Sequence, residues 1–242
     1  MYDDRPFLIL FPGAWGNKTN RLATWWFRHV IDHFKRDYNV VLLTYEGLNL
    51  EDYVDSAVAQ LEKIPDGSYA ICYSMGAQIA RGVAEKRPSL FRRVALLSGV
   101  ERFGIRFSVL LHAMSFALIP LIRTLFLRPF MLDTVKQVSR TFLHDDSPTS
   151  LMWAQGIWER QMKPEPPRVV LSLCLPGLRR TFPPFSCPVM AIVPRQDIFL
   201  MHATYPGEEI QRITAPGGHA LIAGNYSQLR PYLTQILRWF HH

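Results

Sequence analysis

The stretch Ala70–Ala77, "AICYSMGA", contains an apolar run that ends at Ser74 and is followed at once by small residues. Such a run is typical of a strand buried on both faces, and residues 75–86 have the spacing of a helix. Ser74 is therefore predicted to lie at a strand-to-helix junction, on a tight turn that holds its hydroxyl clear of the backbone. Cys72 and Gly76 are small enough to let the strand and the helix touch there.

Buried strands and helices alternate outward from this junction in both directions. The predicted strands are 7–11, 39–45, 69–73, 94–98, 188–193 and 209–214. The predicted helices among them are 20–36, 50–64, 75–86 and 226–240. Strands that alternate with helices predict a parallel sheet with right-handed crossovers, and hence an α/β protein.

Residues 101–185 interrupt the alternation, because they contain no buried strand pattern. The segment starts with the uncharged run 107–122, has amphipathic helical patterns at 133–142 and 149–162, and is broken at Pro164–Pro167. We therefore predict two parts. These are a core formed by residues 1–100 and 186–242, and an inserted helical cap formed by residues 101–185.

The pattern Cys72-x-Ser74-x-Gly76 resembles the nucleophile elbow G-x-S-x-G, with its first glycine replaced. From this motif the chain resembles the α/β-hydrolase superfamily over nearly its whole length. The resemblance implies a mostly parallel sheet flanked by helices, with an all-helical cap inserted. It also implies a catalytic triad in the chain order serine, acid, histidine.

The two partners of the serine are expected in loops that follow later strands. Asp197 follows the strand 188–193 and matches the acid loop, and His219 follows the strand 209–214 and matches the histidine loop. The resemblance implies that His219 takes the Ser74 proton and that Asp197 orients the imidazole. Glu101 is the rival acid, because some members of the superfamily place the acid after the fourth strand.

An oxyanion hole is also implied by the resemblance. Its donors are the backbone N–H of Met75 and that of Ala14, in a loop that resembles the family's His-Gly-x-x loop. Pro12 stands in the position of that histidine.

Simpler interpretations accompany these residues. Ser74 beside a glycine can lie on a plain turn. Asp197 can be a helix N-cap, and His219 can start a helix without any chemistry. Cys72 is interpreted as a packing residue rather than a second nucleophile. The other histidines, including His112 and His144, are interpreted as structural or solvated, and the tryptophans Trp25 and Trp26 as packing residues of a helix.

Composition narrows the function classes. Hydrophobic residues make up 48% of the chain and charged residues 19%, which is typical of a globular protein. The net charge of +7 raises nucleic acid as a partner, but no block of like charges or RNA-binding signature accompanies it, so none is predicted. Three widely spaced cysteines and an N-terminus without a signal-peptide pattern predict a cytoplasmic protein.

The expected reaction is acyl transfer to water from an ester, thioester or lactone. A serine in the elbow argues against dehalogenation and epoxide hydrolysis, which need a carboxylate nucleophile, and no metal or organic cofactor is implied. The apolar start of the cap predicts a substrate with an apolar acyl group. The cap holds eleven basic and six acidic residues, which suits an acyl carrier or an anionic membrane, although ordinary solvated helices explain the same surplus.

Two other function classes stay open at this point. One is a ligand-binding, receptor-like protein on the hydrolase fold with little or no turnover. The other is a membrane-associated interaction protein that uses the apolar cap for peripheral contact. Neither the oligomeric state nor the origin of His241 and His242 follows from the sequence.

Overall fold

The computed structural model describes most of the chain. The described residues are 4–14, 16, 22–105, 107–144, 147–159, 164–175, 180–197, 199–200, 204–205, 207 and 209–242, with only the backbone given at 107–113 and 116.

Six parallel strands form one sheet in the order β2-β1-β3-β4-β5-β6. Their bounds are β1 Phe7–Phe11, β2 Asn39–Leu42, β3 Ser68–Tyr73, β4 Phe91–Leu97, β5 Val189–Pro194 and β6 Ile210–Ala215. Every pairing between neighbours is parallel, as the alternation of strands and helices predicts. The carboxyl ends of all six strands therefore meet at one edge of the sheet.

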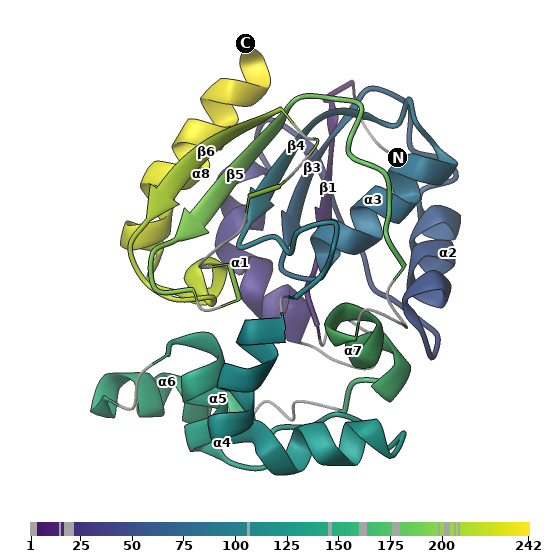
Figure 1. Cartoon of the computed structure of the whole chain (residues 1–242). Helices are drawn as coiled ribbons and strands as arrows, with labels where there is room; N and C mark the ends of the chain where they lie inside the picture. The colour runs from purple at the N-terminus through teal and green to yellow at the C-terminus, as the bar shows by residue number, and fades with distance from the viewer. Residues whose placement is uncertain are drawn as a thin grey trace.

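Helices cover both faces of the sheet (Figure 1). Helices α1 (Leu22–Phe34) and α8 (Tyr226–His241) pack on one face, and α2 (Leu50–Gln60) and α3 (Gly76–Lys86) pack on the other. Successive residues of a strand point to opposite faces, so Leu8 and Leu10 of β1 join the first core while Ile9 and Phe11 join the second. Strands β1, β3 and β5 are buried along almost their whole length because both of their faces are covered, whereas the edge strand β6 has exposed residues.

Among the described residues between β4 and β5, four helices form a layer beyond the carboxyl edge of the sheet (Figure 1). Their bounds are α4 Phe107–Leu125, α5 Val135–Phe142, α6 Pro148–Glu159 and α7 Pro167–Cys174. Helix α4 is kinked, with Ala117 at φ −128° and ψ 29° and with Pro120 inside it. Within the described ranges, no helix combines the length and apolar character needed to cross a bilayer.

The structure differs from the predicted elements at several boundaries. Strand β2 ends at Leu42, three residues before the predicted end, although Leu43 and Tyr45 beyond it are also buried and continue the apolar pattern. Helix α2 ends at Gln60, although Leu61 and Ile64 continue the apolar spacing by packing from a turn. The division of the chain into core 1–100 and 186–242 and cap 101–185 stays a prediction.

Helix α7 was not predicted at all. The proline-rich segment before it indicated a break, and it is one, but its last proline, Pro167, also occupies the first turn of the new helix. Proline is favoured there because the backbone N–H groups of the first helical turn have no partner within the helix, so the N–H that proline lacks is not needed.

Candidate active site

The loops after four strands meet at the carboxyl edge of the sheet. Ala14 follows β1, Ser74 follows β3, Asp197 follows β5 and His219 follows β6. Crevices at the carboxyl ends of parallel strands are the usual ligand sites of such sheets. The sequence predicted the same four loops.

Ser74 has a strained backbone conformation at the junction of β3 and α3. Its φ is 51°, in the left-handed region that non-glycine residues rarely adopt. Gly76 is needed two residues later, since a Cβ there would lie 2.2 Å from the carbonyl oxygen of Phe11. The first residue of α3 thus touches the end of the neighbouring strand β1, where the motif requires a small residue, and the turn lifts the serine side chain toward the helical layer.

A chain of two hydrogen bonds links the three predicted triad residues. The Ser74 hydroxyl lies 2.8 Å from Nε2 of His219, and Nδ1 of His219 lies 2.8 Å from Oδ2 of Asp197. Because a carboxylate only accepts hydrogen bonds, Nδ1 carries the hydrogen and the Nε2 lone pair faces the serine. The arrangement can remove the serine proton and stabilise the imidazolium that results.

Asp197 is fully buried, and its second oxygen is also engaged. Oδ1 accepts a hydrogen bond of 3.0 Å from the backbone N–H of Phe199 and lies 4.0 Å from Nε2 of His144. The rival acid, Glu101, has a different task. Its Oε1 accepts the backbone N–H groups of Thr204 and Tyr205, which fastens a loop after β5.

The histidine loop is fixed against the end of helix α5. The backbone N–H of Ala220 donates a hydrogen bond of 3.0 Å to the carbonyl of Phe142. A Cβ at Gly218 would lie 2.9 Å from the same carbonyl, so the position before His219 admits only glycine without a shift. Phe199 packs edge-on against the imidazole at 4.8 Å between ring centroids. These contacts restrain the ring in the orientation that the two hydrogen bonds need.

Two backbone N–H groups are available beside Ser74. Met75 lies at the N-terminal end of α3 and is buried, and Ala14 lies in the turn closed by the hydrogen bond from Gly16 to Gly13. Within the described part of the chain, neither Ala14 nor Met75 donates its N–H to another residue. Both residues line the same cavity as the serine. Backbone N–H groups that face a cavity in this way can donate hydrogen bonds to a negatively charged oxygen.

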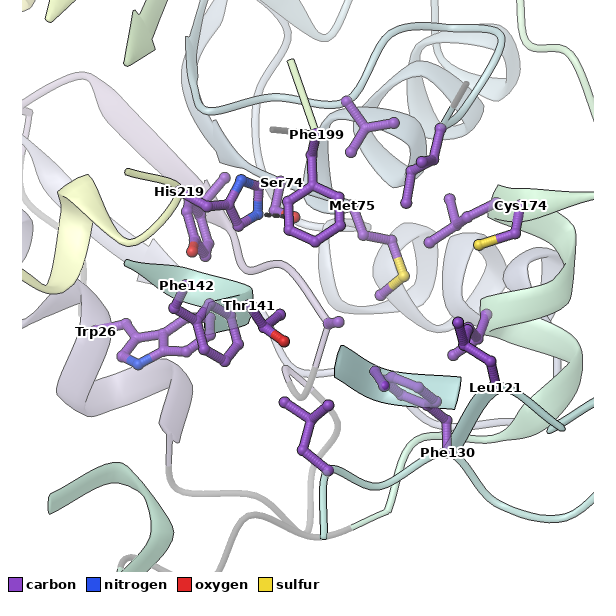
Figure 2. Close-up of a pocket in the computed structure, with 18 residues that line it drawn as sticks. Trp26, Ser74, Met75, Leu121, Phe130, Thr141, Phe142, Cys174, Phe199 and His219 are labelled. Carbon is purple, nitrogen blue, oxygen red and sulfur yellow. Dashed lines mark hydrogen bonds between the residues drawn. The ribbon is translucent and has the colours of Figure 1, made fainter. Parts of the chain in front are cut away.

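A cavity of about 110 Å³ separates Ser74 from the helical layer. Figure 2 shows Ser74 and His219 at one end and Leu121, Phe130 and Cys174 toward the other. Its walls are almost entirely apolar or aromatic, as expected of a pocket for an uncharged group.

Two residues of this site were not predicted from the sequence. His144 was interpreted as structural, yet its ring lies beside Asp197, and Trp26 was interpreted as packing, yet it also lines the cavity. Neither residue follows a strand of the sheet, so no spacing rule could have placed it here.

The buried titratable groups next to Ser74 are less suited than its hydroxyl to act as a nucleophile. Burial raises the pKa of the Cys72 thiol, so the thiolate that a cysteine nucleophile needs is disfavoured. Burial, with the nearby Asp197 charge, likewise raises the pKa of Tyr73. Among the residues that the structure describes, no three His, Cys, Asp or Glu side chains are grouped to hold a metal ion.

Solved structures with the same architecture include several hydrolases. The meta-cleavage product hydrolase from Pseudomonas fluorescens has a TM-score of 0.69 at 12% identity, covering 99% of this chain and 91% of that chain. An extracellular alpha/beta-hydrolase from a Paenibacillus species has a TM-score of 0.68 at 16% identity, covering 95% and 97%. Naproxen esterase from Bacillus subtilis has a TM-score of 0.64 at 17% identity, covering 99% and 85%. At these identities the likeness shows the fold alone, and it confirms the predicted fold class.

No curated protein sequence matches the chain. A family model is decisive instead, because it matches residues 8–229, which include all of the sheet except the first residue of β1 and the whole helical layer. The chain belongs to the alpha/beta hydrolase family.

Proposed function

We propose that this protein is a serine hydrolase that cleaves a carboxylic ester or thioester with an apolar acyl group. The observation that carries the proposal is the pair of 2.8 Å contacts that join Ser74, His219 and Asp197. Nucleophile, base and orienting acid in this geometry are the parts that acyl transfer through a serine requires.

In the first half of the reaction Ser74 becomes acylated. His219 Nε2 removes the hydroxyl proton while Oγ attacks the carbonyl carbon, and the negative oxygen of the tetrahedral intermediate accepts the N–H groups of Met75 and Ala14. The carbon–oxygen or carbon–sulfur bond to the leaving group then breaks. The leaving alcohol or thiol takes its proton from His219, and Asp197 stabilises the imidazolium in between.

The second half returns the enzyme to its starting state. A water molecule takes the place of the leaving group, His219 removes one of its protons, and the resulting hydroxide attacks the acyl-enzyme carbonyl. The carboxylic acid leaves as the proton returns from His219 to Ser74. No redox equivalent is consumed, and one water is used per bond cleaved.

The experiment is covalent labelling together with turnover. A fluorophosphonate probe should label the wild-type protein at Ser74, and p-nitrophenyl esters should be hydrolysed. Ser74→Ala should remove the labelling and lower kcat by about a million-fold, as loss of a serine nucleophile does elsewhere.

Ser98→Ala is the matched control. Ser98 has a φ of 49°, is buried and lies directly after β4, so its replacement puts alanine into the same backbone conformation without removing the nucleophile. The control should keep most of the activity. Ligand binding without labelling in the wild type would favour a receptor-like protein, and labelling that survives in Ser74→Ala would overturn the proposed nucleophile.

A further inference from the structure

A second cavity lies directly behind the catalytic one. It has a volume of about 70 Å³ and is formed between helices α4 and α7. Leu121 and Val170 line both cavities, so these two side chains are the partition between them. Figure 2 shows Leu121 at the side of the catalytic cavity away from His219.

The walls of this second cavity offer nothing to a polar ligand. Leucine, isoleucine, valine and methionine side chains form them, and the one hydroxyl in the wall, that of Thr124, already donates a hydrogen bond of 2.8 Å to the carbonyl of Pro120. An apolar cavity of this kind takes hydrocarbon rather than water.

The catalytic cavity alone is small for an acyl chain. Its volume of about 110 Å³ is below the cavity volume of about 150 Å³ that accommodates benzene in another protein. A group attached to a carbonyl held at Ser74 would therefore reach Leu121 and Val170 after a few carbon atoms. Any longer chain needs the space beyond them.

The outer wall of the second cavity is partly exposed to solvent. Met114, Leu118 and Ile122 of α4 line the cavity and remain 40%, 43% and 42% exposed. A chain that passes the partition is thus directed along α4 toward the surface rather than into a closed end.

We propose that the cavity between α4 and α7 binds the distal part of an acyl chain whose carbonyl lies at Ser74, and that Leu121 and Val170 form the passage to it. The proposal rests on the proposed hydrolase function and names its substrate class, an unbranched acyl chain of medium length. Affinity for such a chain should rise about four-fold with each methylene buried.

A chain-length series tests the proposal. For wild-type protein, kcat/KM for p-nitrophenyl esters should rise from acetyl through butyryl and hexanoyl to octanoyl, and then level off as the chain reaches the exposed outer wall. Leu171→Phe adds volume to a residue that lines the second cavity alone. It should lower kcat/KM for octanoyl by about ten-fold or more while changing that for butyryl less than about two-fold.

Three further variants complete the set. Leu175→Phe fills the same cavity from another position and replaces Leu171→Phe should that variant fold poorly. Leu121→Ala opens the partition and should raise the octanoyl-to-butyryl ratio. Ile119→Phe is the matched control, because it adds a ring on α4 at a residue that is 58% exposed and lines neither cavity.

A binding measurement separates this proposal from the proposed function. Calorimetric titration of Ser74→Ala with butanol, hexanol, octanol and decanol, below their aggregation limits, reports the cavity without any turnover. Chain-length-dependent affinity that Leu171→Phe removes supports the cavity even if no ester is hydrolysed. Hydrolysis that is unaffected by the filling variants, or that falls equally for every chain length, overturns the second cavity as a binding site and leaves the hydrolase proposal standing.

Discussion

At the scale of single residues, two buried carboxylates near the carboxyl edge of the sheet have different surroundings. Asp197 has the imidazole of His219 at 2.8 Å and the backbone N–H of Phe199 on its other oxygen. The Oε1 atom of Glu101 accepts hydrogen bonds from the backbone N–H groups of Thr204 and Tyr205. A carboxylate that orients an imidazole affects the reaction rate, whereas one that fastens a loop affects mainly the stability of the fold.

Asp197→Asn is therefore expected to lower kcat by about ten-thousand-fold, the effect known for the same change in a serine protease. The amide favours the wrong imidazole tautomer and cannot stabilise the imidazolium. Glu101→Gln should change kcat by less than about ten-fold, since its amide oxygen can still accept from the same N–H groups. Steady-state kinetics with circular dichroism of both variants checks this. Equal, mild losses of kcat would mean that the acid has been misplaced.

The site residues that the sequence predicted share one property, and those it missed lack it. Ser74, Asp197 and His219 each follow a strand, and parallel strands bring their carboxyl ends together whatever the intervening sequence. His144 reaches Asp197 only through the packing of α5 against the histidine loop. Packing between segments far apart in the chain has no local signal, so no reading of spacing places His144 there.

At the scale of elements, the kink of α4 places part of the cavity wall. Pro120 has no N–H for the preceding turn, and Ala117, three residues earlier, is non-helical. Ala117 and Leu121, on either side of the proline, both line the catalytic cavity. The kink thus allows one helix to contribute both side chains.

Pro120→Ala should let α4 straighten. The recovered hydrogen bond favours the folded state, and Tm is expected to rise by about 2–4 °C for each kcal/mol gained. The kcat/KM for an octanoyl ester should fall several-fold, because Leu121 moves from its place in the partition.

Pro231→Ala serves as the control for this change, because Pro231 lies inside α8, a helix packed on the sheet and remote from the helical layer in Figure 1. It should leave kcat/KM unchanged. A fall of equal size in both variants would mean that the kink has no particular role in the cavity.

The presence of the strands could be predicted better than the residues at which helices and strands end, and the reason is physical. The strands β1, β3 and β5 are covered on both faces, and their apolar runs follow from that burial. At α2 the apolar spacing continues past the last helical residue because Leu61 and Ile64 pack into the core from a turn. Buried residues produce the same apolar spacing whether or not the backbone is helical. The residue at which a helix or strand ends therefore cannot be predicted from periodicity.

At the scale of the whole molecule, the excess of positive charge is partly neutralised within the fold. Arg123 pairs with Asp133 at 2.8 Å, and Arg180 pairs with Glu51 of α2 and Glu85 of α3. The side chains of Arg128 and Arg168 are exposed in the helical layer or beside it, whereas Arg106, Arg160, Lys163 and Arg179 lie outside the described residues. Partially exposed ion pairs of this kind contribute about 0–1 kcal/mol each, so they add little to the stability of the fold.

The surplus of positive charge that remains should favour an anionic substrate. We expect added salt to lower kcat/KM for an acyl-coenzyme A more than for an uncharged ester of the same chain length, because steering acts on association and is screened over about 10 Å at 0.1 M. The comparison needs rates from low to moderate ionic strength on one protein preparation. Equal salt dependence for the two substrates would leave the basic surplus without a role in substrate choice and would favour simple carboxylesters.

The contact between the end of α5 and the histidine loop limits which segments can be exchanged between hydrolases of this kind. A chimaera that exchanged residues 101–185 as a block would also replace the carbonyl that holds Ala220 and the close-packed surface on which Gly218 lies. The transplanted helices could bring a new specificity and still displace His219, the proposed general base. Recombination should therefore keep the native residues 142–144 and exchange only what precedes or follows them.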